Sequence, residues 1–271
     1  MNRKDMERCF RPVARTGYAA RGVVYVVIGF FAALAAIGSG RTMDTRDALQ
    51  ELLSSGFGSA VAVALVAGLA AYAAWRFVQS VFDTDAHGTG AKGLAVRGGL
   101  LASGITYSGL ALYTFSLWRG AASSSGGGGA VASALAGFIG ATATSAVLAC
   151  VFAGVAIAHF VKAWKEGYAR HLQASARAMR AIHPISKIGL TARGLTFLVI
   201  AVLFGYRALG ERHDRGGQSV GLGDALDFIV GLPAGQWLLG AMGVGLICFA
   251  AYSLTEAWFR RINVEDARAP A

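Results

Sequence analysis

The chain has 271 residues, of which 55% are hydrophobic and only 15% are charged, and its mean hydropathy is +0.52. Soluble domains carry roughly one quarter charged residues, so this composition excludes an ordinary soluble fold. The formal net charge is +10, but the basic residues are dispersed along the chain rather than gathered on one domain, which argues against nucleic acid as a partner.

The apolar residues gather in six blocks, each close to the ~20 residues that a helix needs to cross the hydrocarbon core of a membrane. The blocks lie at about residues 18–37, 59–81, 98–118, 142–163, 190–209 and 236–258. We therefore expect six transmembrane helices. Gly and Ala are frequent in the blocks, and such small residues allow helix backbones to approach closely in lipid.

The Lys and Arg residues predict how these helices are oriented. Most of the 25 lie in the two termini and in the loops that follow the second and fourth blocks, on one side of the membrane. Cytoplasmic loops carry such an excess of basic residues. We therefore expect residues 1–11 and 261–271 to be cytoplasmic. A cleavable signal peptide is the alternative interpretation of the first block, although that block also belongs to a repeat.

A short pattern of basic residues and glycines begins the first, third and fifth blocks. It reads R-x-G-x3-[RS]-G-x2-[YF] and starts at Arg15, at Arg97 and, with lysine in the first place, at Lys187. In the middle copy, Ser103 replaces the second arginine. Every second apolar block opens in the same way, which indicates an internal repeat.

A second shared element, Asp/Ser-Ala-Leu, precedes the second, fourth and sixth blocks. It starts at Asp47, Ser133 and Asp224. A short side-chain oxygen at such a position accepts a hydrogen bond from a free amide of the first helical turn. We expect these three residues to be the N-caps of short outer helices.

Together the two elements divide the chain into three tandem units of two helices. The expected units are residues 12–82, 95–166 and 185–260, with a basic cytoplasmic linker at 167–184. Because each unit contains two helices, all three insert the same way up. The predicted fold class is all-α, a polytopic membrane protein with six transmembrane helices in three parallel two-helix repeats about an axis normal to the membrane.

These units, with their shared opening pattern and D-A-L outer element, resemble the membrane proteins grouped as the domain of unknown function 1206 family. The similarity covers about residues 12–260. It implies a multi-pass protein of the bacterial inner (plasma) membrane, and the family has no established activity to transfer. The middle unit departs most from the pattern, at Ser103, at Ser133 and in the spacer at 123–129.

Two arginines, Arg21 and Arg193, lie well inside their apolar blocks. Their side chains either snorkel to the inner interface or pair with Glu256, which lies near the inner end of the last block. One carboxylate cannot serve two arginines equally well. The second arginine is then available for a lipid phosphate or an anionic solute, which a guanidinium fork suits well.

Several aromatic residues occupy repeated or terminal positions. Tyr25, Tyr107 and Phe197 are equivalent in the three units, and they either form a ring around the threefold axis or serve as ordinary packing residues. The five tryptophans lie near predicted helix ends and are expected to be interface anchors: Trp75, Trp118, Trp164, Trp237 and Trp258.

No cofactor, metal or catalytic residue is expected. His159 is the histidine that lies well inside a block, and it is expected to be packed or hydrogen-bonded rather than to bind a haem. Cys9, Cys150 and Cys248 form no paired motif. Phosphate-loop, nucleophile-elbow and zinc-protease patterns are absent, so the chain is predicted not to be an enzyme.

The inner segment at 162–186 combines Tyr168, Leu172, Met179 and Ile182 with Lys and Arg. It is expected to form a basic helix that lies on the anionic inner leaflet or docks a membrane-protein partner, or else a solvated connecting helix.

The leading functional hypothesis is a structural, assembly or lipid-interacting six-helix bundle. The alternative is a small transporter or channel for a solute or ion along a pseudo-threefold axis, gated at the inner end by Arg21, Arg193 and Glu256. In either case membrane lipids are the expected partners.

Overall fold

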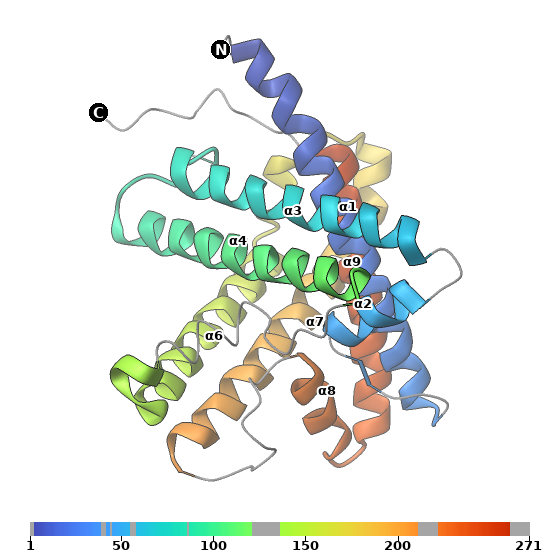
Figure 1. Ribbon diagram of the computed structural model, residues 1–271, viewed down its shortest axis with the longest axis vertical. Helices are drawn as coiled ribbons and strands as arrows, with labels where there is room; N and C mark the ends of the chain where they lie inside the picture. Colours follow the sequence, from blue (N-terminus) through green and yellow to red (C-terminus); the bar gives the residue numbers. More distant parts are fainter. Residues whose placement is uncertain are drawn as a thin grey trace. The chain divides into compact units, whose positions relative to one another are not determined.

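The chain folds into helices, and no strand occurs in the part that the computed structural model describes, namely residues 3–38, 42–43, 45–54, 58–85, 87–120, 136–210 and 222–260 (Figure 1). The elements are α1 (Arg3–Ala36), α2 (Thr45–Ser54), α3 (Gly58–Phe82), α4 (Ala91–Trp118), α6 (Ala141–Trp164), the 3₁₀ helix η1 (Ala169–His171), α7 (Ala176–Ala208), α8 (Leu222–Val230) and α9 (Gly235–Phe259). The predicted all-α class is confirmed.

Six of the described helices are long and apolar enough to cross a membrane, as predicted: α1, α3, α4, α6, α7 and α9. α4 and α7 begin at Ala91 and Ala176, earlier than the apolar blocks near 98 and 190 indicated. Hydropathy marks only the lipid-crossing part of a helix, whereas the polar turns that precede it are also helical.

The chain divides into two compact units. Unit 1 comprises Met1–Arg21, Leu52–Gly127 and Ser253–Ala271, and unit 2 comprises Gly22–Glu51 and Gly128–Tyr252. α1 and α9 therefore each contribute one end to unit 1 and the remainder to unit 2. The units cut across the three expected repeats, whose boundaries stay a prediction.

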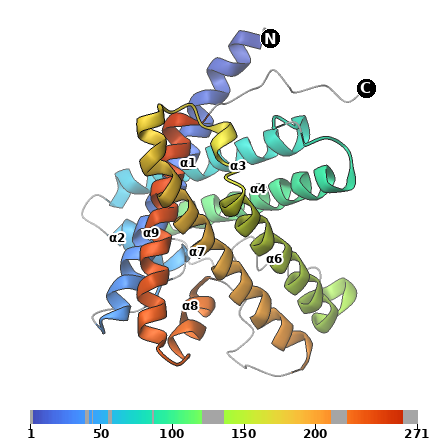
Figure 2. The ribbon, with the colours of Figure 1, turned by 180° about the vertical axis from the view of Figure 1, so that it is seen from behind.

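Unit 1 contains α3 and α4, which lie side by side and are joined by a short turn (Figures 1 and 2). In that turn Asp83 adopts a φ of 47°, and its carboxylate accepts hydrogen bonds from the backbone N–H groups of His87 (2.8 Å) and Gly88 (2.7 Å). Burial disfavours the charged carboxylate, but the two donors together with the charges of His87 and Arg97 outweigh it and hold the pKa of Asp83 below its ordinary value. The ionised side chain thus stabilises the turn between the two helices.

In unit 1, α1 and α3 approach closely at two glycines. A Cβ added to Gly17 would lie 2.6 Å from the Cα of Tyr72, and one added to Gly68 would lie 2.5 Å from the Cβ of Ala20. Both distances are too short for a real side chain. The glycines are therefore required by helix contact, as expected for small residues between membrane helices.

Unit 2 contains α6 and α7 side by side, together with α8 and the remaining parts of α1 and α9 (Figure 2). Its core includes Ile200 and Phe204 of α7 and Ala225 of α8, with Phe152 of α6 packed against them. α1 and α9 also meet at small residues, because a Cβ added to Gly29 would lie 2.8 Å from the carbonyl oxygen of Gly243.

The contacts between α7 and α9 repeat those between α1 and α3. A Cβ added to Gly189 would lie 2.5 Å from the backbone nitrogen of Phe249, and one added to Gly245 would lie 2.3 Å from the Cβ of Ala192. Gly189 holds the same place in the opening pattern as Gly17 of α1. The first helix of each of these two hairpins thus packs on its own second helix in the same register.

The expected caps are not at the cap positions. Asp47 is the third residue of α2 and Asp224 is the third residue of α8, so both lie in the first turn. A carboxylate there is favoured by the positive end of the helix dipole, as it is at the cap, so the residue type alone did not define the exact start of the helix. Ser133 lies outside the described residues.

The basic segment at 162–186 does not form a helix of its own. α6 ends at Trp164, and α7 begins at Ala176, where the Oγ of Ser175 accepts a hydrogen bond from the backbone N–H of Ala178 (3.3 Å). The second part of the segment is therefore the first turns of α7. The sequence did not show this because Pro184 lies inside the helix and interrupts the pattern.

Candidate functional site

Arg21 lies in the interior of unit 1, where its side chain is 7% exposed. Each of its three guanidinium nitrogens donates a hydrogen bond: Nε to the Oγ of Ser253 (3.0 Å), Nη1 to the hydroxyl of Tyr72 (2.5 Å) and Nη2 to the Oε2 of Glu256 (2.6 Å). The Glu256 side chain is only 3% exposed. The structure therefore pairs Glu256 with Arg21, and this pair joins α1 to α3 and α9.

Further polar contacts continue from this pair. Arg260 donates to the Oε1 of Glu256 and, from Nη2, to the Oδ2 of Asp85 (3.2 Å). The same Asp85 oxygen accepts a hydrogen bond from Nε2 of Gln79 (2.9 Å). Arg260 and Asp85 have side chains that are 7% and 15% exposed. The turn after α3 is thereby connected to the end of α9.

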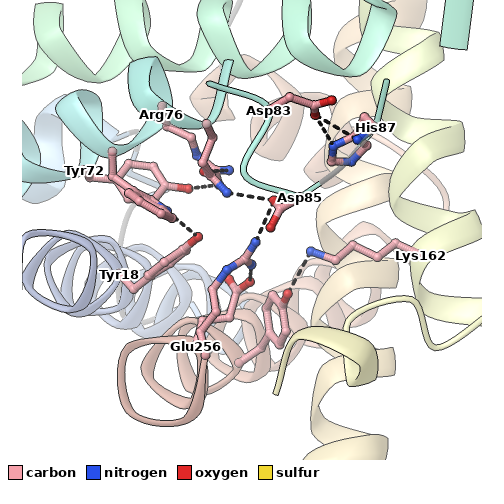
Figure 3. Close-up of polar contacts among 12 residues, drawn as sticks. Tyr18, Tyr72, Arg76, Asp83, Asp85, His87, Lys162 and Glu256 are labelled. Carbon is pink, nitrogen blue, oxygen red and sulfur yellow. Dashed lines mark hydrogen bonds and ion pairs between the residues drawn. The ribbon is translucent and has the colours of Figure 1, made fainter. Parts of the chain in front are cut away.

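The contacts close into a ring at Arg76, whose Nη1 donates to the Oε1 of Gln79 (3.0 Å) and whose Nη2 donates to the hydroxyl of Tyr72 (Figure 3). We call this ring the Arg21 cluster. It consists of Arg21, Tyr72, Arg76, Gln79, Asp85, Arg260 and Glu256. Its three arginines face two carboxylates, so one positive charge is in excess.

Aromatic rings stabilise the excess positive charge. The Tyr18 ring lies under the guanidinium of Arg21 at 5.2 Å and under that of Arg260 at 5.3 Å. The Tyr72 ring lies 4.6 Å from the guanidinium of Arg76. Cation–π contacts of this length are worth about 0.5–1 kcal/mol at exposed sites and about 2 kcal/mol when water is excluded. The cluster is therefore stabilised by ring faces as well as by carboxylates.

Most of the Arg21 cluster was not predicted. Arg76 lies inside an apolar block and Gln79 follows one turn later. Two polar residues on one face of an apolar helix are a signal for such a cluster, but no role was predicted for either from the sequence.

The prediction that Trp75 is an interface anchor was wrong, since Trp75 is 1% exposed and donates from Nε1 to the hydroxyl of Tyr18 (3.2 Å). A tryptophan near a helix end is buried when a neighbouring helix supplies such an acceptor.

Arg193 has a different environment, in unit 2. Its guanidinium lies over three rings, at 4.7 Å from Tyr25, 4.2 Å from Phe197 and 5.8 Å from Phe249. Its side chain is half-buried, and within the described part of the chain it forms no hydrogen bond or ion pair. The two arginines of the opening pattern thus differ, because Arg21 has a carboxylate partner and Arg193 has ring faces.

The three residues of the expected aromatic ring do not share one environment. Tyr25 and Phe197 meet at Arg193 in unit 2, and Tyr25 also packs edge-on against Phe249 at 4.9 Å. Tyr107 belongs to unit 1 and packs edge-on against Tyr72 at 4.5 Å. A ring around a threefold axis stays a prediction.

The connection between α6 and α7 is held by polar contacts in unit 2. Glu166 accepts a hydrogen bond from Lys187 Nζ (2.7 Å), which lowers the pKa of Glu166 against the opposing effect of desolvation, and it lies 3.4 Å from His183. The Tyr168 hydroxyl lies 3.0 Å from Nδ1 of the same histidine. Burial of Tyr168, together with the nearby Glu166 carboxylate, raises its pKa to about 12. The first turns of α7 are thus attached to this turn.

His159 is packed and hydrogen-bonded. Its Nδ1 lies 2.9 Å from the carbonyl oxygen of Val155, and its ring lies 5.2 Å from that of Phe197. Within the described ranges, no group of three or more His, Cys, Asp or Glu side chains is placed to hold a metal ion.

Comparison with known proteins gives one family match and one relative. The family model described as Domain of Unknown Function (DUF1206) matches twice, at residues 16–83 and 188–260, which together make up just over half of the chain. The "Uncharacterized protein YxxB" of Bacillus subtilis (strain 168) is 26% identical over 258 residues, covering 93% of this chain and 91% of that protein. No solved structure matches.

Proposed function

The chain belongs to the family called Domain of Unknown Function (DUF1206), and on this premise we propose that it is a structural membrane protein rather than an enzyme. In this proposal it resides in the plasma membrane of a bacterium with both termini in the cytoplasm. The bacterial relative and the excess of Lys and Arg on one side of the predicted spans support this placement.

The observation that carries the proposal is that every guanidinium nitrogen of Arg21 donates a hydrogen bond within the protein. All three of its nitrogens donate to side chains of the protein itself, and Glu256 accepts from both Arg21 and Arg260. A gating arginine of a transporter needs donors that turn toward a passing solute. The Arg21 cluster instead uses its donors to hold α1, α3 and α9 together, which supports a structural role.

A repeated architecture accompanies this role. The family model matches two stretches, and in both the first glycine of the opening pattern contacts the second helix of the same hairpin, at Tyr72 and at Phe249. These paired contacts support a repeat in the first and third units. The proposal extends it to the middle unit, which gives three parallel hairpins.

The proposed cytoplasmic side offers a basic surface to membrane lipids. Arg177 and Arg180 are exposed on the first turns of α7. Each basic residue near an anionic leaflet contributes about 1 kcal/mol of attraction. We propose that the inner leaflet, or a membrane-protein partner assembled there, contacts this surface.

The test compares two arginines on one helix. Arg21→Met should lower the midpoint of thermal unfolding in detergent and the amount of protein in the membrane. Arg15→Met removes the same charge from an exposed position six residues earlier, where the side chain donates to the carbonyl oxygen of Trp258, and should change both much less. An Arg21→Met protein that inserts normally and is as stable as the wild type, yet loses flux of an anion in proteoliposomes, would instead establish the transporter.

A further inference from the structure

Arg193 occupies the same position in its hairpin as Arg21 does in the first hairpin. In each hairpin the arginine lies over an aromatic residue of its own second helix, Tyr72 at 5.1 Å for Arg21 and Phe249 at 5.8 Å for Arg193. Tyr72 and Phe249 are also the residues that the glycines of the opening pattern contact. The two arginines therefore occupy equivalent sites, and the remaining neighbours can be compared directly.

The other neighbour of each arginine comes from a different hairpin. Arg21 meets α9, which supplies Glu256. α7, which carries Arg193, packs instead on α6, where the Phe160 ring would lie 2.7 Å from a Cβ added to Gly194. The contact between the Phe152 and Phe197 rings, 5.9 Å apart, joins the same two helices. The residue at the end of α6 that corresponds to Glu256 can therefore be found from the alignment of the hairpins.

That residue is a lysine. Lys165 follows Gly154 at the same spacing at which Glu256 follows Gly245, and the three units align without a gap through these glycines. Where the hairpin that packs on Arg21 supplies a carboxylate, the aligned position of the hairpin that packs on α7 therefore carries a positive charge. Lys165 is exposed, directly after the end of α6.

A further cation lies on adjoining rings. Lys162, in the last turn of α6, donates from Nζ to the hydroxyl of Tyr252 (2.8 Å) and lies 5.2 Å from the centre of that ring. The Tyr252 ring is 6.0 Å from the Phe249 ring, and Phe249 lies under Arg193. Two cations therefore share one pair of neighbouring rings on α9.

The carboxylate on the connecting turn is already engaged. Glu166 accepts from Lys187 at 2.7 Å and lies 3.4 Å from His183, so it offsets charge on α7 nearer the start of that helix. Positive charge in a membrane helix is costly unless a counter-charge is supplied. The ring contacts use the faces of the Arg193 guanidinium and leave its N–H groups, which lie in its plane, free to donate.

We propose that Arg193, with Lys162 in the last turn of α6 and Lys165 directly after it, binds a phosphate group at this end of unit 2. A guanidinium fork and two ammonium groups match the charge and the acceptor oxygens of phosphate. The group is carried either by an anionic phospholipid headgroup or by a soluble phosphate. This inference goes beyond the structural role proposed above. The Arg21 cluster belongs to the other unit, and its proposed structural role does not depend on whether Arg193 binds a ligand.

The experiment uses the full chain, purified in mild detergent, with three separate probes: phosphatidylglycerol, phosphatidylcholine and inorganic phosphate. Native mass spectrometry counts bound lipid, and the shift in thermal unfolding reports phosphate. The wild type should retain phosphatidylglycerol over phosphatidylcholine, or be stabilised by millimolar inorganic phosphate. Arg193→Gln should weaken whichever ligand binds by about tenfold or more, as expected for the loss of charge-assisted hydrogen bonds.

Two further variants make the result decisive. Arg170→Gln removes a charge from an exposed residue of the same connecting segment and should leave binding unchanged. Lys165→Glu keeps Arg193 and supplies the carboxylate that Arg21 already has, so it should also abolish binding, and it decides the question if Arg193→Gln fails to fold. Equal binding by all four proteins would overturn the proposal. So would equal retention of phosphatidylcholine and phosphatidylglycerol together with no stabilisation by inorganic phosphate.

Discussion

Arg21 and Arg193 hold the same place in two copies of one pattern, and both lie over an aromatic residue of their own hairpin. Arg21 is 7% exposed and paired with a carboxylate, whereas Arg193 is half-buried and contacts three ring faces. The difference comes from the helix that another hairpin packs beside each arginine. A repeated residue thus acquires its role from a neighbour that the repeat does not conserve.

The two environments also predict different energies. Removing one partner of a buried ion pair leaves an uncompensated charge, which costs about 3–5 kcal/mol. Removing an arginine that contacts only rings costs about 1 kcal/mol. Substitutions at equivalent positions should therefore have unequal effects on the free energy of unfolding, and this inequality is what the following variants test.

The largest effect is expected for Glu256→Gln, because Glu256 accepts from Arg21 and Arg260 and is 3% exposed. We expect a loss of about 3–5 kcal/mol in the free energy of unfolding, measured by reversible unfolding in detergent micelles. Lys165→Gln at the equivalent exposed position should change it by less than about 0.5 kcal/mol. Similar losses for both variants would remove the distinction between the two sites.

The next largest effect is expected at the glycines of the opening pattern, where the first helix of each hairpin contacts the second. Gly17→Ala and Gly189→Ala should each cost about 1–3 kcal/mol, because the new methyl group would overlap the backbone of Tyr72 or Phe249. Gly99 holds the same place in the middle unit, and a Cβ there meets no atom of the described residues within 4 Å. Gly99→Ala should therefore be neutral or slightly stabilising in the same unfolding assay. A cost at Gly99 equal to that at Gly17 would show that the middle unit packs in the same way.

A smaller effect is expected for Arg193→Met, which removes ring contacts but no ion pair. The free energy of unfolding should fall by about 1 kcal/mol or less in lipid-free detergent. A loss as large as that of Glu256→Gln would mean that Arg193 has an acidic partner within the protein, and the comparison would fail.

The smallest effect concerns the pH dependence of the turn between α6 and α7. The hydrogen bond from Lys187 holds the pKa of Glu166 below its ordinary value of 4.5. A lowered pKa stabilises the folded state above that ordinary value, and the stabilisation is lost as the pH falls through the lower folded pKa. The unfolding midpoint of the wild type between pH 6 and pH 3 should show this loss, and Lys187→Gln should not. If Arg193→Gln abolished it instead, Glu166 would be the counter-charge of Arg193.

Much of the fold could be predicted, but little of the Arg21 cluster. The six spans follow from block length, and the position of Glu256 near an arginine follows from its place at the end of the last block. Which arginine it meets depends on the helix that packs beside it, which no local pattern encodes. Asp85 is part of the cluster because Asp83 shapes a turn that carries it back to Arg260. Such contacts depend on tertiary packing rather than on hydropathy.

The central claim is that Glu256 is the specific counter-charge of Arg21, and a double-mutant cycle tests it most directly. Unfolding of the wild type, Arg21→Met, Glu256→Gln and the double variant should give a coupling free energy of about 2–3 kcal/mol, as expected for a buried charge-assisted hydrogen bond. Additive effects, with a coupling below about 0.5 kcal/mol, would contradict the claim and place the stabilising interactions of α1, α3 and α9 elsewhere.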